Sequence, residues 1–472
     1  MASTATATTA VMNEIESNGS RTGLVPVPTP NRAGGTTGPR RPEMVPSVQH
    51  SEAKATAANE KTAPMADFGA KCRSVPVVDL VNLIARTAAQ SGASDVHIEP
   101  RKEGIIVRYR LDGILTQITE LPKWMDAALT SRVKVLAGLD IAEKRKPQDG
   151  RLVVQGEKGE DIAFRVSTMP TQFGEKVVMR LLRDHAAVPT LQSLGYSASD
   201  LERLKGFLKH KHGMILVVGP TGSGKSTSLS AAIASVTSPE VNIITLEDPI
   251  EYQLPGVNQT QINEKADLTF TTALRAVLRQ DPDVVLVGEV RDAETARIAM
   301  QASQTGHLVL STLHTDDAPS AVTRLMDMGV ESYVISSALL GVVAQRLMRK
   351  LCSDCKVPMK PSRRVQEDLG LTDEEVANTT IYGPCGCPKC HNTGYRGRIG
   401  LYEVMEVTDS VNRCIVSGAR VDAVREAALK DGMTSLGEDG LAKVLAGVTS
   451  AEELLRVVSR PCDERQNKQK AA

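Results

Sequence analysis

The sequence predicts an α/β protein with two successive α/β domains, the second containing a parallel sheet covered by helices on both faces. Length and composition agree with this class, because 472 residues with 41% hydrophobic and 24% charged side chains suffice for two or three globular domains. From residue 200 to 350, short apolar runs alternate with segments of helical spacing. Such continuous apolar strands are typical of a parallel sheet buried on both faces.

The charge balance and the scarcity of aromatic residues argue against a nucleic-acid partner. Lys plus Arg number 56, Asp plus Glu also number 56, and aromatic residues make up 3% of the chain. Such a chain offers neither a bulk positive field nor a base-stacking platform. The start, MASTATATTAVMNEIESNG, does not resemble a secretory signal, and no apolar run is long enough to span a bilayer. We therefore expect the eight cysteines to be in a reducing compartment.

The amino-terminal part is predicted to contain a disordered tail and a first α/β domain. Residues 1–74 are rich in Ala, Thr, Pro, Gly and Ser, and they contain too few apolar anchors to fold. The domain, 75–183, is predicted to begin with a helix in VVDLVNLIARTAAQ. A strand (DVHIE), a hairpin turning at Asp112–Gly113 and a helix in WMDAALTSRVKVLAG follow. The remaining strands are RLVVQ, DIAFRVST and KVVMRLL.

A linker at 184–199 contains Pro189 and Gly195 and is the predicted hinge before the second domain, 200–350. In this domain the strand MILVV precedes a helix that starts at Gly224, and VNIITLE is a second strand. DVVLVGE precedes the helix ETARIAMQAS, and HLVLST precedes a helix that begins near Ala318. Beyond it we predict a cysteine-rich subdomain over 351–400, a helical region over 401–460 and a short tail, 461–472.

A phosphate-binding loop lies between the strand MILVV and the following helix. Residues 219–227 read GPTGSGKST and match GxxxxGK[ST] in the strand–helix setting that this motif requires, which makes a chance glycine-rich loop a poor alternative. Backbone N–H groups and the helix N-terminus would hold the phosphates. Lys225 would bridge the β- and γ-phosphates and Ser226 would ligate Mg²⁺. The predicted ATP-binding residues are Gly219, Pro220, Thr221, Gly222, Ser223, Gly224, Lys225, Ser226 and Thr227.

Glu289 is the candidate catalytic base. It ends the apolar strand DVVLVGE, at the carboxyl edge of the sheet where ligands bind in such folds. From there its carboxylate could orient and deprotonate the attacking water. A solvated glutamate at a strand end is the alternative, and the neighbouring phosphate-binding loop favours the functional interpretation.

Two CxxC pairs predict a structural zinc site. Cys352 and Cys355 form one pair, Cys387 and Cys390 the other, and four thiolates on one tetrahedral zinc leave no open position for catalysis. The 31 intervening residues exceed the usual compact spacing, so they must form a loop or small subdomain. A redox role would require a thioredoxin-like βαβ unit, and none is evident. Cys385 could replace Cys387 as a ligand.

Read in order, these motifs resemble the secretion-superfamily ATPases that drive type II secretion and type IV pilus assembly. The resemblance covers roughly residues 76–460. TLEDPIEYQ (245–253) is similar to that family's aspartate box, and LRAVLRQDPDVVLVGEVRD (274–292) to its Walker B segment. TGHLVLSTLHTDDA (305–318) resembles its histidine box, and SDVHIEP (94–100) the signature of its preceding domain. The implied fold is a RecA-like core that follows a smaller PAS-like domain.

The resemblance assigns roles to individual residues. Glu289 would be the catalytic glutamate, and Glu247 a second carboxylate beside the magnesium and the water. His307 and His314 would contact the γ-phosphate region. Arg165 and Arg180 would reach the nucleotide across a subunit boundary, with Arg275 a weaker candidate, although each lies where an ordinary surface charge would also fit. The family also carries a tetracysteine insertion followed by a segment like GYRGRIGLYEV (394–404).

The implied protein is a hexameric Mg²⁺-dependent ATPase with structural zinc, cytoplasmic and peripheral to the inner membrane. It would push on an inner-membrane platform protein to assemble pilins or pseudopilins, and the cysteine pairs favour assembly over retraction. The residues leave open the choice between secretion and pili. Two other classes are a nucleic-acid translocase and a ring scaffold that binds ATP without hydrolysis. Salt-sensitive DNA binding would favour the first, and absence of turnover the second.

Overall fold

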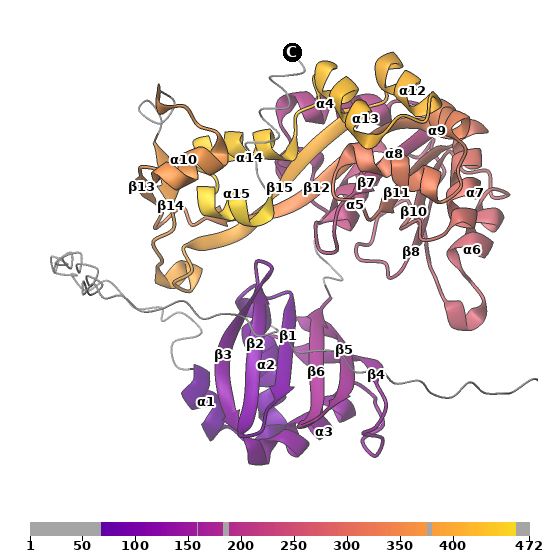
Figure 1. Cartoon of the computed structure of the whole chain (residues 1–472). Helices are drawn as coiled ribbons and strands as arrows, with labels where there is room; N and C mark the ends of the chain where they lie inside the picture. Colours follow the sequence, from indigo (N-terminus) through magenta and orange to yellow (C-terminus); the bar gives the residue numbers. More distant parts are fainter. Residues whose placement is uncertain (1–67, 158, 183–187, 375–379, 459–472) are drawn as a thin grey trace, which may run out of the picture. The chain divides into compact units, whose positions relative to one another are not determined.

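A computed structural model describes residues 68–157, 159–182, 188–374 and 380–458 of the chain (Figure 1). Most of the predicted disordered tail and all of the tail 461–472 lie outside these residues. Order begins earlier than predicted, because a helix α1 (Phe68–Ser74) precedes residue 75. Phe68 and Cys72 lie four residues apart on one face of this helix, and both are buried. These two apolar side chains anchor the helix, although the low-complexity composition around them predicted disorder.

The first sheet has six strands, all antiparallel, in the order β3-β2-β1-β6-β5-β4. The predicted hairpin is confirmed, since Asp112 and Gly113 both have positive φ at its turn. The six strands are β1 (Asp95–Pro100), β2 (Gly104–Leu111), β3 (Ile114–Pro122), β4 (Gln148–Gln155), β5 (Asp161–Thr171) and β6 (Gly174–Leu181).

Within the described residues, helices pack against one face of this sheet. The helices α2 (Val77–Gln90) and α3 (Asp126–Leu136) belong, with α1, to one apolar cluster that includes Val96, Ile98 and Met179. The alternate residues of the same strands point to the other face, which carries charged side chains. The predicted site residues Arg165 and Arg180 therefore lie on the polar face of this sheet.

The second sheet has seven strands in the order β15-β12-β7-β11-β10-β8-β9. Every neighbouring pair is parallel except β12 and β15, so the parallel sheet predicted for residues 200–350 is confirmed and is extended by one antiparallel strand from beyond that range. Its strands are β7 (Gly213–Val218), β8 (Ile243–Glu247), β9 (Asn258–Gln261), β10 (Val284–Val287), β11 (Leu308–Leu313), β12 (Leu339–Leu351) and β15 (Tyr395–Glu406).

Helices cover both faces of this sheet, as the continuous apolar strands predict (Figure 1). On one face, Ile215 and Val217 of β7 share a cluster with α4 and α5. On the other, Met214 and Leu216 share a cluster with helices α6 to α9, α12 and α13. The helices are α4 (Ala198–Leu208), α5 (Lys225–Val236), α6 (Phe270–Val277), α7 (Ala293–Gln304), α8 (Ala318–Asp327), α9 (Ser332–Ala338), α12 (Asp409–Val416) and α13 (Val421–Lys430).

The predicted hinge falls partly outside the described residues. Its later part is ordered, since η2 (Leu191–Leu194) contributes Leu191 to the cluster that contains α5. No helix in the described part of the chain is long and apolar enough to cross a bilayer.

The cysteine-rich segment follows β12 and returns through β15. It contains a two-stranded sheet of β13 (Val357–Met359) and β14 (Ile381–Gly383). A fourth apolar cluster joins this segment to the carboxyl-terminal helices through Met348, Ile381 and Leu401. The helices packed there are α10 (Arg363–Leu369), α14 (Leu436–Leu445) and α15 (Ala451–Val457).

Candidate nucleotide site and candidate metal centre

The loop 219–227 connects the buried strand β7 to helix α5, which starts at Lys225. Gly219, Gly222 and Gly224 all have positive φ, with values of 146°, 79° and 89°. Side chains with a Cβ adopt such backbone conformations at a cost, so glycine is required for the loop to wrap. The wrapped loop leads directly into the N-terminus of α5, whose dipole favours an anion.

Lys225 is folded back over the loop. Its ammonium donates hydrogen bonds to the carbonyl oxygens of Gly219, at 2.7 Å, and Pro220, at 3.2 Å. Burial lowers the pKa of Lys225, and the negative charge of Glu289 partly opposes this shift. The ammonium therefore lies inside the curve of the loop and within electrostatic range of the candidate base.

The loop residues fit a phosphate group. The Oγ atom of Ser223 is buried and has no hydrogen-bond partner among the described residues, which makes it available as a donor to an oxygen atom inside the loop. Ser226 is exposed in the first turn of α5, where its hydroxyl can reach a metal ion bound with the phosphates. These residues could hold ATP and Mg²⁺ by the interactions that the motif predicts.

Glu289 follows β10, the second strand along the sheet from β7. Its carboxylate pairs with Arg291, and its Oε2 lies 3.7 Å from Nε2 of His314. His314 follows β11, the strand between β7 and β10. Glu289, His314 and the loop are thus brought to the same carboxyl edge of the parallel strands, as predicted for ligand-binding residues.

Glu247 ends β8 at the same edge of the sheet, and its side chain is buried. Its Oε1 accepts hydrogen bonds from Thr245 Oγ1 at 2.7 Å and from Gln259 Nε2 at 2.9 Å. Both donors are neutral side chains, and together they fix the orientation of the carboxylate. This is the chemistry expected of a group that faces a metal ion or its water ligands.

His307 is not brought to this edge. It precedes β11, and its Nδ1 lies 2.9 Å from the carbonyl oxygen of Ala302. The Gly213 N–H at the start of β7 donates to the His307 carbonyl, so this histidine lies at the amino edge of the sheet. Because β11 is six residues long, the two edges are separated by roughly 17 Å. Within one chain, His307 and the loop therefore do not meet.

Arg165 and Arg180 lie on the six-stranded sheet, directly opposite each other on β5 and β6. Nε of Arg180 donates to Oδ1 of Asp95 at 2.9 Å. Burial would raise the pKa of Asp95, but hydrogen bonds from Arg180 and Ser94 and the nearby arginine charges outweigh it and lower this pKa. The structure thus places the two arginines side by side, on a different sheet from the loop. Arg275, the weaker candidate, is exposed on α6 and pairs with Glu294 at 2.5 Å.

Four of the cysteines converge on one point. The Sγ atoms of Cys352, Cys355, Cys387 and Cys390 all lie within 4.8 Å of one another. The first pair occupies the turn after β12, and the second pair flanks a short 3₁₀ turn, Pro388–Cys390. Cys385 is exposed and does not belong to this group. The geometry therefore selects Cys387 between the two candidates for the fourth ligand.

The cluster fits a tetrahedral zinc ion. The Sγ atoms are separated by 3.9 Å (Cys352–Cys387), 3.8 Å (Cys355–Cys390) and 3.7 Å (Cys387–Cys390). A tetrahedron with Zn–S bonds of about 2.3 Å has sulfur atoms roughly 3.8 Å apart. Backbone N–H groups of Gly386 and Gly394 point at Cys355 and Cys390, the outer hydrogen bonds that commonly accompany metal thiolates. The residues could hold zinc in a closed, structural site.

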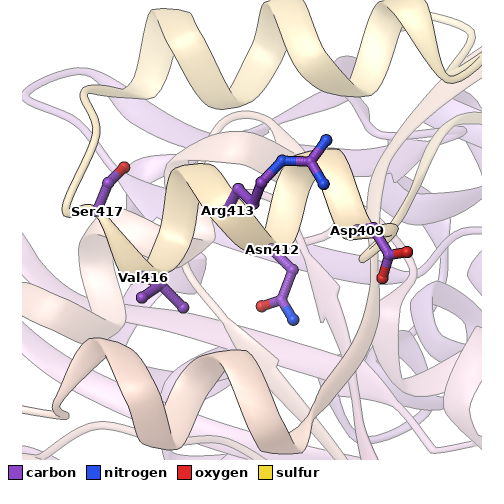
Figure 2. A pocket seen from close by; sticks show the side chains of 5 residues that line it. All are labelled: Asp409, Asn412, Arg413, Val416 and Ser417. Carbon is purple, nitrogen blue, oxygen red and sulfur yellow. The ribbon is translucent and has the colours of Figure 1, made fainter.

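A shallow hollow of about 370 Å³ lies elsewhere, along α12 (Figure 2). It is lined by Asp409, Asn412, Arg413, Val416 and Ser417. None of these is a predicted site residue, and the hollow does not involve the loop 219–227 or the cysteine cluster. It has no evident part in the chemistry described above.

Two glutamines support the site without having been predicted. Gln259 on β9 holds Glu247, and Gln345 on β12 contacts the loop itself. A glutamine that follows directly on the apolar run LLGVVA is the only sequence signal for Gln345. A buried amide there requires partners, but the sequence does not indicate which ones.

Comparison with known proteins shows that this chain is similar to proteins of secretion systems. The family model described as "Type II/IV secretion system protein" matches residues 71–456. The type II secretion system ATPase E of Vibrio cholerae is 50% identical over 384 residues, covering 81% of this chain and 75% of the relative. The type II secretion system protein HxcR of Pseudomonas aeruginosa is 49% identical over 382 residues, covering 81% and 77%.

The type IV pilus assembly ATPase PilB of Thermus thermophilus is 47% identical over 375 residues, which cover 79% of this chain but only 42% of that relative. Among solved structures, the pilus retraction motor PilT with bound ADP is 25% identical, with a TM-score of 0.55, covering 83% of this chain and 100% of that one. The ATPase DotB of Legionella pneumophila, at 20% identity and a TM-score of 0.59, covers 82% and 96% and shares the fold.

Proposed function

The chain belongs to the type II/IV secretion system protein family, and we propose that it is a hexameric motor that hydrolyses ATP to assemble pilin-like subunits. The observation that carries the proposal is the set of groups at one edge of the second sheet. There the loop 219–227, Glu289, Glu247 and His314 follow or end neighbouring strands. Relatives described as a type II secretion ATPase and a type IV pilus assembly ATPase support both the reaction and its purpose.

In the proposed reaction, the loop amides and Lys225 bind the phosphates, and Ser226 supplies a ligand to Mg²⁺. Phosphate oxygens compete with the carbonyls of Gly219 and Pro220 for the Lys225 ammonium. Glu289 orients the water and accepts its proton once its pairing with Arg291 is relaxed. Glu247 would hold water ligands of the bound Mg²⁺, which would supply charge stabilisation at the γ-phosphate.

Arg165 and Arg180 complete the site from a neighbouring subunit and stabilise charge on the transferring phosphoryl group. Occupancy of the site then favours a closed arrangement of the two α/β domains, and hydrolysis releases it. In a ring beneath the inner membrane, this motion acts on an integral-membrane platform protein. The tetracysteine cluster, as a structural zinc site, favours assembly over retraction.

Steady-state phosphate release by the purified full chain tests the proposal. We expect turnover with Mg²⁺-ATP, its loss in EDTA, and its loss in Lys225→Ala. Absence of turnover in a folded protein that still binds ADP would favour a ring scaffold that binds ATP without hydrolysis. Strong stimulation by DNA, with binding that weakens steeply as salt is raised, would instead favour the translocase class.

A further inference from the structure

We propose that Gln345 is a positioning residue for the phosphate-binding loop, holding one peptide plane so that an N–H group faces the phosphates. The inference rests on the nucleotide site of the proposed function but does not require that the site hydrolyses ATP. Gln345 lies on β12, whose Ala344 is the register partner of Val218, the last residue of β7. It is therefore one residue beyond the paired region, beside the first residue of the loop.

Two glycines let β12 come this close to the loop. A Cβ atom on Gly219 would collide with the backbone oxygen of Gln345. A Cβ atom on Gly224 would lie 2.9 Å from the side-chain Nε2 of Gln345, closer than such atoms approach. The backbone oxygen and the side-chain amide of Gln345 thus occupy space that Gly219 and Gly224, respectively, leave open, in addition to the conformational freedom these glycines provide.

Both ends of the Gln345 amide are hydrogen bonded, and the side chain is 2% exposed. Nε2 donates to the carbonyl oxygen of Ser223 at 2.8 Å, inside the loop. Oε1 accepts from the Ser228 hydroxyl at 2.7 Å, one turn into α5. A single buried amide therefore ties β12 to the loop and to the helix that follows it, and it fixes their relative positions.

The bond to Ser223 determines the direction of the next N–H group. In a trans peptide the C=O of Ser223 and the N–H of Gly224 point in opposite directions in one plane. Because the carbonyl is held toward Gln345, the Gly224 N–H is held away from β12. Loops of this motif bind phosphate through N–H groups at this position, so Gln345 selects the binding orientation before nucleotide arrives. Gln345 itself has no reach to the reacting atoms.

The test measures equilibrium binding of a fluorescent ADP analogue, with Mg²⁺, to the full chain. Gln345→Met keeps the shape of the side chain but removes both hydrogen bonds, and we expect affinity about tenfold weaker. Ser228→Ala removes the second bond, together with the contacts of its hydroxyl with Tyr196 and Tyr402, but leaves the bond to Ser223 in place. It is the matched control and is expected within about threefold of wild type. If the protein turns over ATP, KM should rise in Gln345→Met with kcat within about twofold, because binding of ground state and transition state is weakened equally.

A second variant separates positioning from packing. In Gln345→Glu the introduced carboxyl can donate to the Ser223 carbonyl only when protonated, so ADP affinity relative to wild type should recover as pH is lowered from 8 toward 6. Unchanged affinity in Gln345→Met, or equal losses in Gln345→Met and Ser228→Ala, would overturn the proposal. So would loss of the fold in both Gln345 variants, since Gln345 would then be a determinant of folding rather than of loop orientation.

Discussion

Two carboxylates at the edge of the second sheet are held in different ways. Glu247 accepts hydrogen bonds from the neutral side chains of Thr245 and Gln259, which fix its orientation. Glu289 is instead paired with the cation of Arg291 and lies near His314. Arg291 occupies one carboxylate oxygen of Glu289, so that oxygen can receive a proton from water only after this contact is released. We infer that Arg291 moves away from Glu289 when the site is assembled for hydrolysis, whereas Glu247 needs no rearrangement.

The ionic contacts of Asp95 predict a pH dependence for the six-stranded sheet. Because the folded-state pKa of Asp95 lies below its ordinary value of 3.8, this carboxylate contributes stability above that pH and loses it as the pH falls through the folded-state pKa. Asp95→Asn should therefore lower the free energy of unfolding by about 1 to 2 kcal/mol at pH 7. The difference between variant and wild type should shrink below pH 4.

Urea unfolding followed by hydrogen exchange of peptides from β1 and β6 measures this effect, because these strands carry Asp95 and Arg180. Asp149→Asn, at an exposed position on β4, is the control and should change the free energy by less than about 0.5 kcal/mol. An equal loss of stability for Asp95→Asn at pH 3 and pH 7 would contradict the account.

At the scale of elements, local sequence patterns predicted the strands and helices whose residues are buried in one regular pattern along their length. The apolar runs of β7, β10 and β11 are buried on both faces, so their sequence is determined by burial alone. The strand β15 was missed because Gly397 and Gly400 interrupt its pattern and because its first half borders the cysteine segment. It pairs with β12 from Gly341 to Leu351, a long-range contact that no local signal encodes.

The part of the candidate site that lies in contiguous sequence motifs could be predicted from the sequence. The loop 219–227 and the strand ends at Glu247 and Glu289 were found in this way. His307 and His314 belong to the same sequence motif, but they lie at opposite ends of the six-residue strand β11. Gln345 acts through partners more than a hundred residues away in sequence, so the sequence showed only a glutamine directly after an apolar run.

The turn elements that hold the cysteines make a specific prediction about metal content. Full-length protein should bind about one zinc ion per chain, and Cys387→Ser should lose most of it because a thiolate ligand is removed. Cys385→Ser is the matched control and should retain the wild-type content, since the Cys385 side chain lies outside the cluster. Metal analysis of the purified variants by mass spectrometry measures both. Loss of zinc in Cys385→Ser with retention in Cys387→Ser would reverse the assignment.

At the scale of the whole molecule, the proposed ring would bring Arg165 and Arg180 of one chain, which lie on a different sheet from the loop, to the loop of a neighbouring chain. If Arg165 acts across a subunit boundary, Arg165→Ala and Glu289→Gln should each be inactive alone. In rings assembled from an equal mixture, a subunit with intact Glu289 can meet a neighbour with intact Arg165. Random mixing gives about one quarter of sites with both groups, so about a quarter of wild-type turnover should return.

Phosphate release after denaturation and co-refolding, or co-expression, of the two variants measures this recovery. Arg165 is the better choice for the experiment than Arg180, because its replacement leaves the Asp95–Arg180 ion pair in place. Affinity purification through a tag carried by one variant alone must recover the other variant from the same samples, which shows rings of mixed composition. Mixed rings without any recovered turnover would mean that both groups act within one subunit, or that Arg165 has no part in the reaction.

The central claim is that Glu289 makes a phosphate-binding loop into a hydrolytic site, and Glu289→Gln tests it most directly. The substitution preserves size and hydrogen bonding but removes the base. Single-turnover phosphate release at saturating Mg²⁺-ATP should fall at least about 100-fold, while the affinity for ADP stays within about twofold of wild type. Full turnover by a folded Glu289→Gln protein that binds ADP normally would contradict the account.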